Sequence, residues 1–175
     1  KPTFGMTAGI HGLEKVGTHL ALHYLRSFLQ QMEWDDELKE RMQNCRIVSI
    51  PLVNPAGMHA SRRSNPNGVD LMRNAPVNAE TKTPFLLGGH RLSNRLPWYR
   101  GAIDQPMETE SQALVQFIAA EMFESAMSMS LDLHSGFGAI DRLWYPYSKT
   151  TQPFPLINVA MQFNKLLNKA YPFHI

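Results

Sequence analysis

The chain has 175 residues, of which 43% are hydrophobic, and a formal net charge of +2, a composition typical of one soluble globular domain over residues 1–175. Acidic and basic residues are intermixed, so no basic stripe predicts a nucleic acid as partner. Cys45 is the only cysteine, which excludes an internal disulfide framework and any metal site built from several cysteines.

The sequence contains no apolar stretch near the roughly 20 residues that cross a bilayer, so we expect no membrane partner. Lys1-Pro2-Thr3 does not begin a secretory signal, and the single cysteine is compatible with a reducing compartment. A cytoplasmic location is therefore favoured, although the chain begins without Met and a processed start would hide a signal. The oligomeric state stays open.

The first half of the chain alternates between predicted strands and helices. Residues 3–10 form an apolar run typical of a buried strand, and residues 16–32 place apolar side chains at helical spacing. A charged helical or turn connection follows over residues 34–43. Residues 45–53 are apolar and β-branched, typical of a second buried strand, and Asn54-Pro55-Ala56-Gly57 ends it.

The second half begins with a long segment over residues 57–106 that lacks periodicity and is rich in Asn, Pro, Gly and Arg. Long loops of this kind tend to carry binding residues. A helix is predicted over residues 108–123, a strand over 128–133, a further strand over 143–147 and an amphipathic helix over 154–170. This order predicts an α/β sandwich with a largely parallel or mixed sheet.

A histidine and a glutamate lie where the first predicted strand meets the first helix. His11 precedes Glu14 by three residues, so an imidazole nitrogen and a carboxylate oxygen can converge on one side of a turn. The pair alone also fits a solvated glutamate at a helix start. His134 follows another apolar strand and should emerge at the same sheet edge, beyond the carboxyl ends of the strands. We therefore predict a metal site of His11, Glu14 and His134, a ligand set known from hydrolytic zinc sites.

Two aspartates are candidates for orienting these histidines, because a metal-bound imidazole usually donates its other N–H to an acceptor. They are Asp70 and Asp132, and Asp132 lies two residues before His134, so both side chains point to the same face of the strand. An ion pair with an arginine is the alternative for Asp132. His19 and His23 have the spacing of a rival zinc pair, but we predict that they face solvent, since the apolar side of their helix lies elsewhere.

Four short blocks occur in a fixed order along the chain: His11-Gly12-Leu13-Glu14, Asn54-Pro55-Ala56-Gly57, Val69-Asp70-Leu71-Met72-Arg73-Asn74 and Asp132-Leu133-His134-Ser135. Together they resemble the M14 family of zinc carboxypeptidases. The resemblance implies a three-layer α/β/α sandwich with a mixed, largely parallel sheet, incomplete at its C-terminal end. It also implies that the three predicted ligands bind Zn²⁺ and that the substrate is a peptide.

The resemblance further implies roles for the charged residues of the long loop. Asp70 would orient His11, and Arg73, together with Asn74, would bind the C-terminal carboxylate of the peptide. Arg63 would polarise the scissile carbonyl and stabilise its oxyanion, a role that Arg62 could take instead. A guanidinium suits both tasks because it offers paired donors and keeps its charge.

The chain departs from the family pattern at two points. Met72 stands where the family usually has Asn, and its thioether is a weak acceptor and no donor. The family's general base is a glutamate well after the third ligand, whereas this chain has no glutamate after Glu124 and Asp141 is the only acid beyond His134. The resemblance therefore implies that the base lies outside these 175 residues and that this segment alone has poor activity.

Two other interpretations compete with a metallocarboxypeptidase. One is a deacylase of N-acyl amino acids that resembles the succinylglutamate desuccinylase and aspartoacylase branch, which shares three of the blocks. The other is a non-catalytic module that keeps the fold and the metal, and it is favoured by the absent glutamate.

Overall fold

The computed structural model describes residues 1–136, 141–145 and 147–172, which belong to two compact units. The first, here called the sheet unit, comprises Lys1–Ala75 and Phe85–Ser135. The second, here called the C-terminal unit, comprises the described residues of Pro76–Pro84 and Gly136–Ile175. All residues that the sequence predicts as metal ligands lie in the sheet unit.

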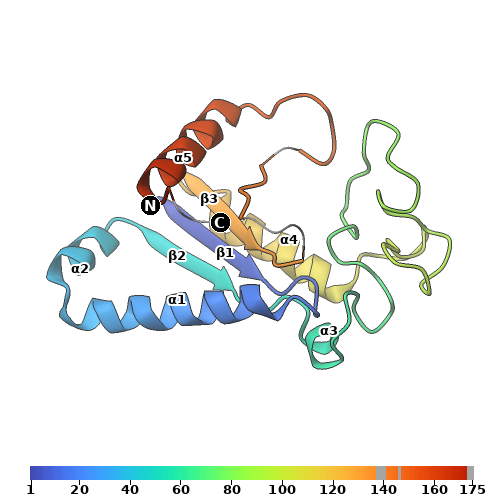
Figure 1. Ribbon diagram of the computed structural model, residues 1–175, viewed down its shortest axis with the longest axis horizontal. Coiled ribbons are helices and arrows are strands. Elements are labelled where there is room, and N and C mark those ends of the chain that lie inside the picture. Colours follow the sequence, from blue (N-terminus) through green and yellow to red (C-terminus); the bar gives the residue numbers. More distant parts are fainter. Residues whose placement is uncertain (137–140, 146, 173–175) are drawn as a thin grey trace. The chain divides into compact units, whose positions relative to one another are not determined.

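A parallel sheet of β1 (Thr3–Ala8), β2 (Arg46–Ile50) and β3 (Ser128–Leu133) forms the centre of the sheet unit, in the order β2-β1-β3 (Figure 1). β1 therefore pairs on both sides, and residue Thr7 stands opposite Asp132 of β3. Parallel neighbours bring their carboxyl ends to one edge of the sheet. The strands predicted over residues 3–10, 45–53 and 128–133 are confirmed, although β2 ends at Ile50 and β1 ends at Ala8, before Gly9 adopts a φ of +66° and turns the chain.

Two helices cover opposite faces of this sheet. α1 (Lys15–Trp34) packs its buried Ala21 against Met6 and Ala8 of β1. Gly5 faces the other way, because successive strand residues alternate between faces, and a Cβ built there would lie 2.7 Å from Sδ of Met122 in α4 (Thr109–Met122). The three-layer α/β/α arrangement that the family resemblance implied is confirmed.

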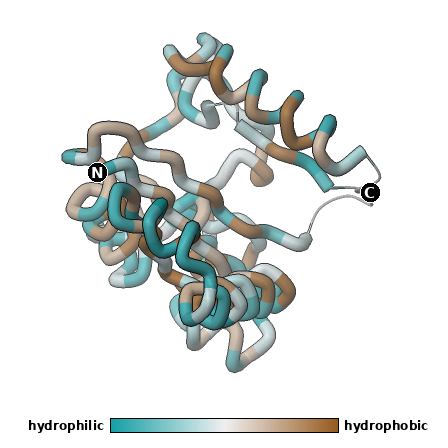
Figure 2. The backbone as a smooth tube through the Cα atoms, turned by 90° about the vertical axis from the view of Figure 1, so that its left-hand side faces the viewer, coloured by the Kyte–Doolittle hydropathy of each residue, from teal (hydrophilic) through white to brown (hydrophobic). Residues whose placement is uncertain are grey.

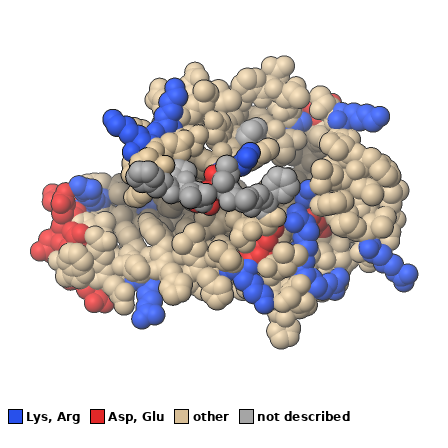
Figure 3. Space-filling view, viewed as in Figure 1, with Lys and Arg blue, Asp and Glu red and all other residues tan. Residues whose placement is uncertain are grey.

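Two short helices lie between the larger elements. α2 (Asp36–Met42) is capped by Asp35, whose Oδ1 accepts from the Leu38 N–H at 2.9 Å, and acidic side chains gather over it in Figure 3. α3 (Pro55–His59) begins after Asn54, whose Oδ1 accepts from the Gly57 N–H at 2.9 Å. The Asn54-Pro55 pair thus starts a short helix, whereas its predicted role as the end of the second strand is wrong, because β2 already ends at Ile50.

The C-terminal unit contains α5 (Ile157–Ala170), whose backbone tube alternates between hydrophobic and hydrophilic colours in Figure 2. Lys149 and Glu80 join the two segments of this unit by an ion pair at 3.3 Å. The strand predicted over 143–147 is wrong at the described positions 143–145 and 147, which are not in a strand. A strand needs a neighbour to pair with, and the Tyr147 ring instead contacts the Phe154 ring, with centroids 5.3 Å apart.

Within the described residues, no helix has the length and apolar character that a membrane crossing requires.

Candidate metal centre

Three side chains converge beyond the carboxyl ends of β1 and β3. Nδ1 of His11 lies 2.8 Å from Oε1 of Glu14, and Nδ1 of His134 lies 3.1 Å from Oε2 of the same carboxylate. One ligand atom from each residue lies within 4.8 Å of the others, which makes these the group of described residues that could hold a metal ion. The structure thus brings together the three residues that the sequence predicts as ligands.

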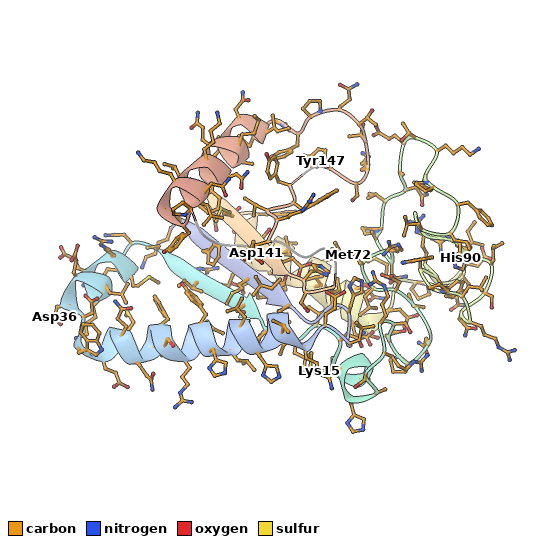
Figure 4. The ribbon with its side chains drawn as sticks, viewed as in Figure 1. Lys15, Asp36, Met72, His90, Asp141 and Tyr147 are labelled. Atoms are coloured by element: carbon orange, nitrogen blue, oxygen red, sulfur yellow. The ribbon has the colours of Figure 1, made fainter. Side chains whose placement is uncertain are left out.

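The turn after β1 depends on two glycines. Gly9 takes the left-handed backbone conformation, and Gly12 packs so closely on α3 that an added Cβ would lie 2.0 Å from the carbonyl carbon of Gly57. The Glu14 N–H donates to the His11 carbonyl at 3.0 Å, which closes the turn. Figure 4 shows Lys15, directly after Glu14, at the end of the sheet where β1 finishes. His11 and Glu14 are therefore held on the same side of one compact turn.

Both histidines present the same nitrogen to Glu14 and the other nitrogen to an aspartate. Nε2 of His11 faces Oδ1 of Asp70 at 3.4 Å, and Nε2 of His134 faces Oδ2 of Asp132 at 2.7 Å. A carboxylate that accepts the Nε2–H leaves the Nδ1 lone pair available for a metal ion. The two aspartates predicted to orient the histidines thus each lie beside the Nε2 atom of one histidine.

The electrostatics of the centre favour a cation. Burial alone would raise the pKa of Glu14, but hydrogen bonds from His11, His134 and the Ser135 N–H hold that pKa well below its usual range. Hydrogen bonds to Asp132 and Glu14 raise the pKa of His134 to about 9. Burial lowers the pKa of His11, yet hydrogen bonds to Asp70 and Glu14 outweigh it, so this pKa is also raised. The carboxylates thus create a site that holds positive charge, and its two imidazoles and one carboxylate are a donor set that fits zinc.

Asp70 joins the centre to two arginines. Its buried Oδ2 accepts from Nε of Arg63 and from Nη1 of Arg73, both at 3.0 Å. Nη1 of Arg63 also lies 3.5 Å from Oε1 of Glu14. Burial would raise the pKa of Asp70, but the His11 hydrogen bond and the charges of both arginines lower it to about 2. Of the predicted arginines, Arg63 and Arg73 therefore lie around one ionised carboxylate beside the predicted ligands.

A loop over residues 85–101 holds Arg73 from the other side. Nε of Arg73 donates to the Leu87 carbonyl at 2.9 Å, and Nε of Arg100 donates to the Arg73 carbonyl at 3.0 Å. Buried His90 fixes this loop, because its Nδ1 accepts from the Leu92 N–H at 3.1 Å and its Nε2 faces the Pro97 carbonyl at 2.8 Å. Figure 4 labels His90 within this loop. Sequence reasoning found no role for His90, because no motif surrounds it.

The remaining predicted residues take different positions. Asn74 is buried and bonded at both ends of its amide, since Nδ2 donates to the Arg100 carbonyl at 2.7 Å and Oδ1 accepts from the Glu108 N–H at 2.8 Å. Arg62 is exposed, and Met72, labelled in Figure 4, is half-exposed. His19 and His23 are exposed, which confirms that they face solvent.

The comparison with protein families decides the classification. The model of the family described as zinc carboxypeptidase, Peptidase M14, matches residues 1–173. The chain belongs to the M14 zinc carboxypeptidase family. Membership of this zinc-dependent family supports a carboxypeptidase-like hydrolase and agrees with the His-Glu-His donor set.

Individual relatives in the family are distant. Carboxypeptidase D of Mus musculus is 26% identical over 161 residues, which are 87% of this chain and 10% of that protein. Carboxypeptidase M of Mus musculus is 33% identical over 99 residues, or 49% of this chain and 22% of that protein. The chain thus spans only a small part of the length of these relatives. A solved structure, the murein-tripeptide amidase MpaA from Escherichia coli O157, has 24% identity and a TM-score of 0.48, with 76% of this chain and 50% of that chain covered.

Proposed function

We propose that this protein is a zinc metallocarboxypeptidase, which binds Zn²⁺ through His11, Glu14 and His134 and hydrolyses the amide bond before a free C-terminal carboxylate. The observation that carries the proposal is the paired geometry of the two imidazoles. Each Nδ1 faces Glu14, and each Nε2 faces an aspartate of its own. A metal-bound imidazole usually donates its other ring N–H to an acceptor, so this arrangement at both histidines supports two metal ligands.

Zinc in this position would supply a Lewis acid that polarises a carbonyl and makes water a stronger nucleophile at neutral pH. The residues of the chain would supply orientation and charge. Asp70 and Asp132 would keep both imidazoles in the Nε2–H tautomer. Ser135 would fix Glu14 through its backbone N–H, which donates to Oε2 at 3.0 Å.

Arg63 and Arg73 are the proposed contacts to substrate. Arg63 borders the ligands, is one-third exposed and would donate to the oxyanion that develops on the scissile carbonyl. Arg73 retains 21% side-chain exposure and would bind the substrate carboxylate, while Asp70 and the Leu87 carbonyl hold its guanidinium in place. Asn74 would act indirectly, because its amide ties this segment to the Arg100 and Glu108 backbone.

Three carboxylates of the centre are unsuited to accept the proton of the attacking water. Glu14, Asp70 and Asp132 each hold an imidazole, so a proton taken by any of them would weaken the orientation of a ligand. None of these three carboxylates is therefore proposed as the general base.

The metal assignment is tested by zinc content. Dialysed protein should contain one zinc per chain by elemental analysis, and His134→Ala should lose most of it. His23→Ala is the matched control, because this histidine is exposed on α1, and it should keep the full zinc content. Unchanged zinc in His134→Ala would contradict the assignment.

The substrate assignment is tested with matched compounds. A peptide with a free C-terminus should be hydrolysed, and its C-terminal amide should not, because Arg73 then has no carboxylate to bind. N-acyl amino acids form a third arm of the assay. Hydrolysis of these compounds without cleavage of the peptide would replace the carboxypeptidase by a deacylase.

A further inference from the structure

A buried hydroxyl group lies behind the aspartate that orients His134. Oγ1 of Thr7 donates to Oδ1 of Asp132 at 2.8 Å. Thr7 belongs to β1 and Asp132 to β3, and the two residues stand directly opposite in the parallel register. Thr7 is only 4% exposed, so this hydrogen bond connects the interior of the sheet to the metal centre.

The two oxygens of Asp132 have separate tasks. Oδ1 accepts from Thr7, and Oδ2 lies 2.7 Å from Nε2 of His134. A bond to Oδ1 restricts rotation of the carboxylate about its χ2 angle, which is otherwise broad for aspartate. The hydroxyl of Thr7 therefore directs Oδ2 toward the imidazole.

Asp132 needs such support more than Asp70 does. Asp70 is 1% exposed, and two guanidinium groups bond to its Oδ2. The Asp132 side chain is 32% exposed, so water competes for its oxygens, and its hydrogen bond from the protein interior comes from one neutral hydroxyl. The two histidines are thus held by aspartates of unequal rigidity, and the weaker one depends on β1.

We propose that Thr7 is a positioning residue of the metal site, which acts through Asp132 on the orientation of His134. The inference rests on the proposed zinc site and deepens it. Without the hydroxyl, the carboxylate of Asp132 rotates, the Nε2–H bond weakens and Nδ1 of His134 is presented less often to the metal. Residues that orient metal ligands typically change metal affinity about 10–100-fold when they are removed.

Three variants separate positioning from packing. Thr7→Val keeps the shape of the side chain and removes the hydroxyl, whereas Thr7→Ser keeps the hydroxyl. Thr3→Val is the matched control, because Thr3 lies on the same face of β1 with the same 4% exposure but stands opposite Ser128. Affinity for Zn²⁺ alone is measured by competition with a fluorescent chelator, and folding of the zinc-free variants is checked by circular dichroism.

Thr7→Val should bind Zn²⁺ about tenfold more weakly than the wild type, at the lower end of the expected range because it acts through Asp132. Thr7→Ser and Thr3→Val should keep the wild-type affinity. If Thr7→Val does not fold, Thr7→Ser is compared with Thr7→Ala, a pair that also isolates the hydroxyl, and the same loss is expected in Thr7→Ala.

An unchanged affinity in the folded variant that lacks the hydroxyl, or an equal loss in Thr3→Val, would overturn the role of Thr7. The role would also be overturned if Thr7→Ser lost as much affinity as Thr7→Val. These outcomes leave the proposed zinc site intact as long as the wild type binds zinc and His134→Ala does not. A wild-type protein without zinc would instead contradict the proposed function itself.

Discussion

Asp70→Asn removes the charge that holds the metal ligand and both arginines in one network. The amide has nearly the same shape as the carboxylate, so packing changes little. The Arg63 and Arg73 guanidinium groups, however, lose the ionised oxygen that accepts from each of them at 3.0 Å. We expect the zinc-free variant to be less stable than the wild type at neutral pH, because removal of one partner leaves partly buried charges without compensation.

The size of this effect follows from the pKa of Asp70, which falls from 3.8 to about 2 in the folded protein. One pKa unit corresponds to about 1.4 kcal/mol, so the ionised carboxylate contributes about 2 kcal/mol to the free energy of unfolding. Because the folded pKa is the lower one, this contribution is complete above pH 3.8 and is lost as the pH falls toward about 2. The variant and the wild type should therefore converge in acid.

The assay is urea unfolding of zinc-free protein, followed by circular dichroism at several values between neutral pH and about pH 2, which spans the range where the linkage acts. The control is Asp36→Asn, since Asp36 forms an exposed pair with Lys39 on α2 and should change stability little at neutral pH. Equal stability of Asp70→Asn and wild type at pH 7, or a difference that does not shrink in acid, would refute the reasoning.

Three further predictions follow from the same geometry. Zinc-free protein should lose stability as the pH rises from 6.5 to about 9, because folding raises the pKa of His134 from 6.5 to about 9. Thermal unfolding at both ends of this pH range measures the loss, and His134→Gln should remove most of it. A wild-type stability that does not change with pH over this range would contradict the prediction. Gly12→Ala should destabilise the protein by about 3 kcal/mol, because the added methyl group would overlap the backbone of Gly57. Urea unfolding measures this change, and a midpoint equal to that of the wild type would contradict the prediction. Gly89→Ala should lower the free energy of unfolding by about 1–2 kcal/mol, because φ at this position is +95°. The added methyl group should also displace Arg100 from Arg73 and so raise KM for a peptide with a free C-terminal carboxylate. Loss of bound zinc in this variant would instead place the effect at the metal.

The elements with strong apolar patterns could be predicted from the sequence. Residues 128–133 were expected as a strand and form β3 with the same bounds, because one apolar run is closed by the loop that starts at Ser135. The grouping of His11 and His134 could be predicted for a related reason, since the carboxyl ends of parallel strands meet at one sheet edge. A local pattern and one topological rule were enough to place these residues.

Other features depend on contacts that no local pattern encodes. Residues 143–145 carry apolar side chains, but a strand forms only if another strand lies alongside, and none pairs with these positions. Nothing in residues 85–101 indicated that the Leu87 carbonyl and Arg100 hold Arg73, since this loop has no periodicity. The bond between Thr7 and Asp132 became visible only once β1 and β3 were known to be neighbours in register.

X-ray absorption at the zinc edge tests the central claim most directly, because it reports the atoms that surround the metal in the whole protein. The wild type should show two imidazole nitrogens at about 2.0–2.1 Å and a carboxylate oxygen at about 2.0–2.2 Å. His134→Ala should lose one imidazole contribution or the metal altogether. A spectrum with sulfur ligands, or with the same imidazole count in wild type and His134→Ala, would contradict a zinc site built from His11, Glu14 and His134.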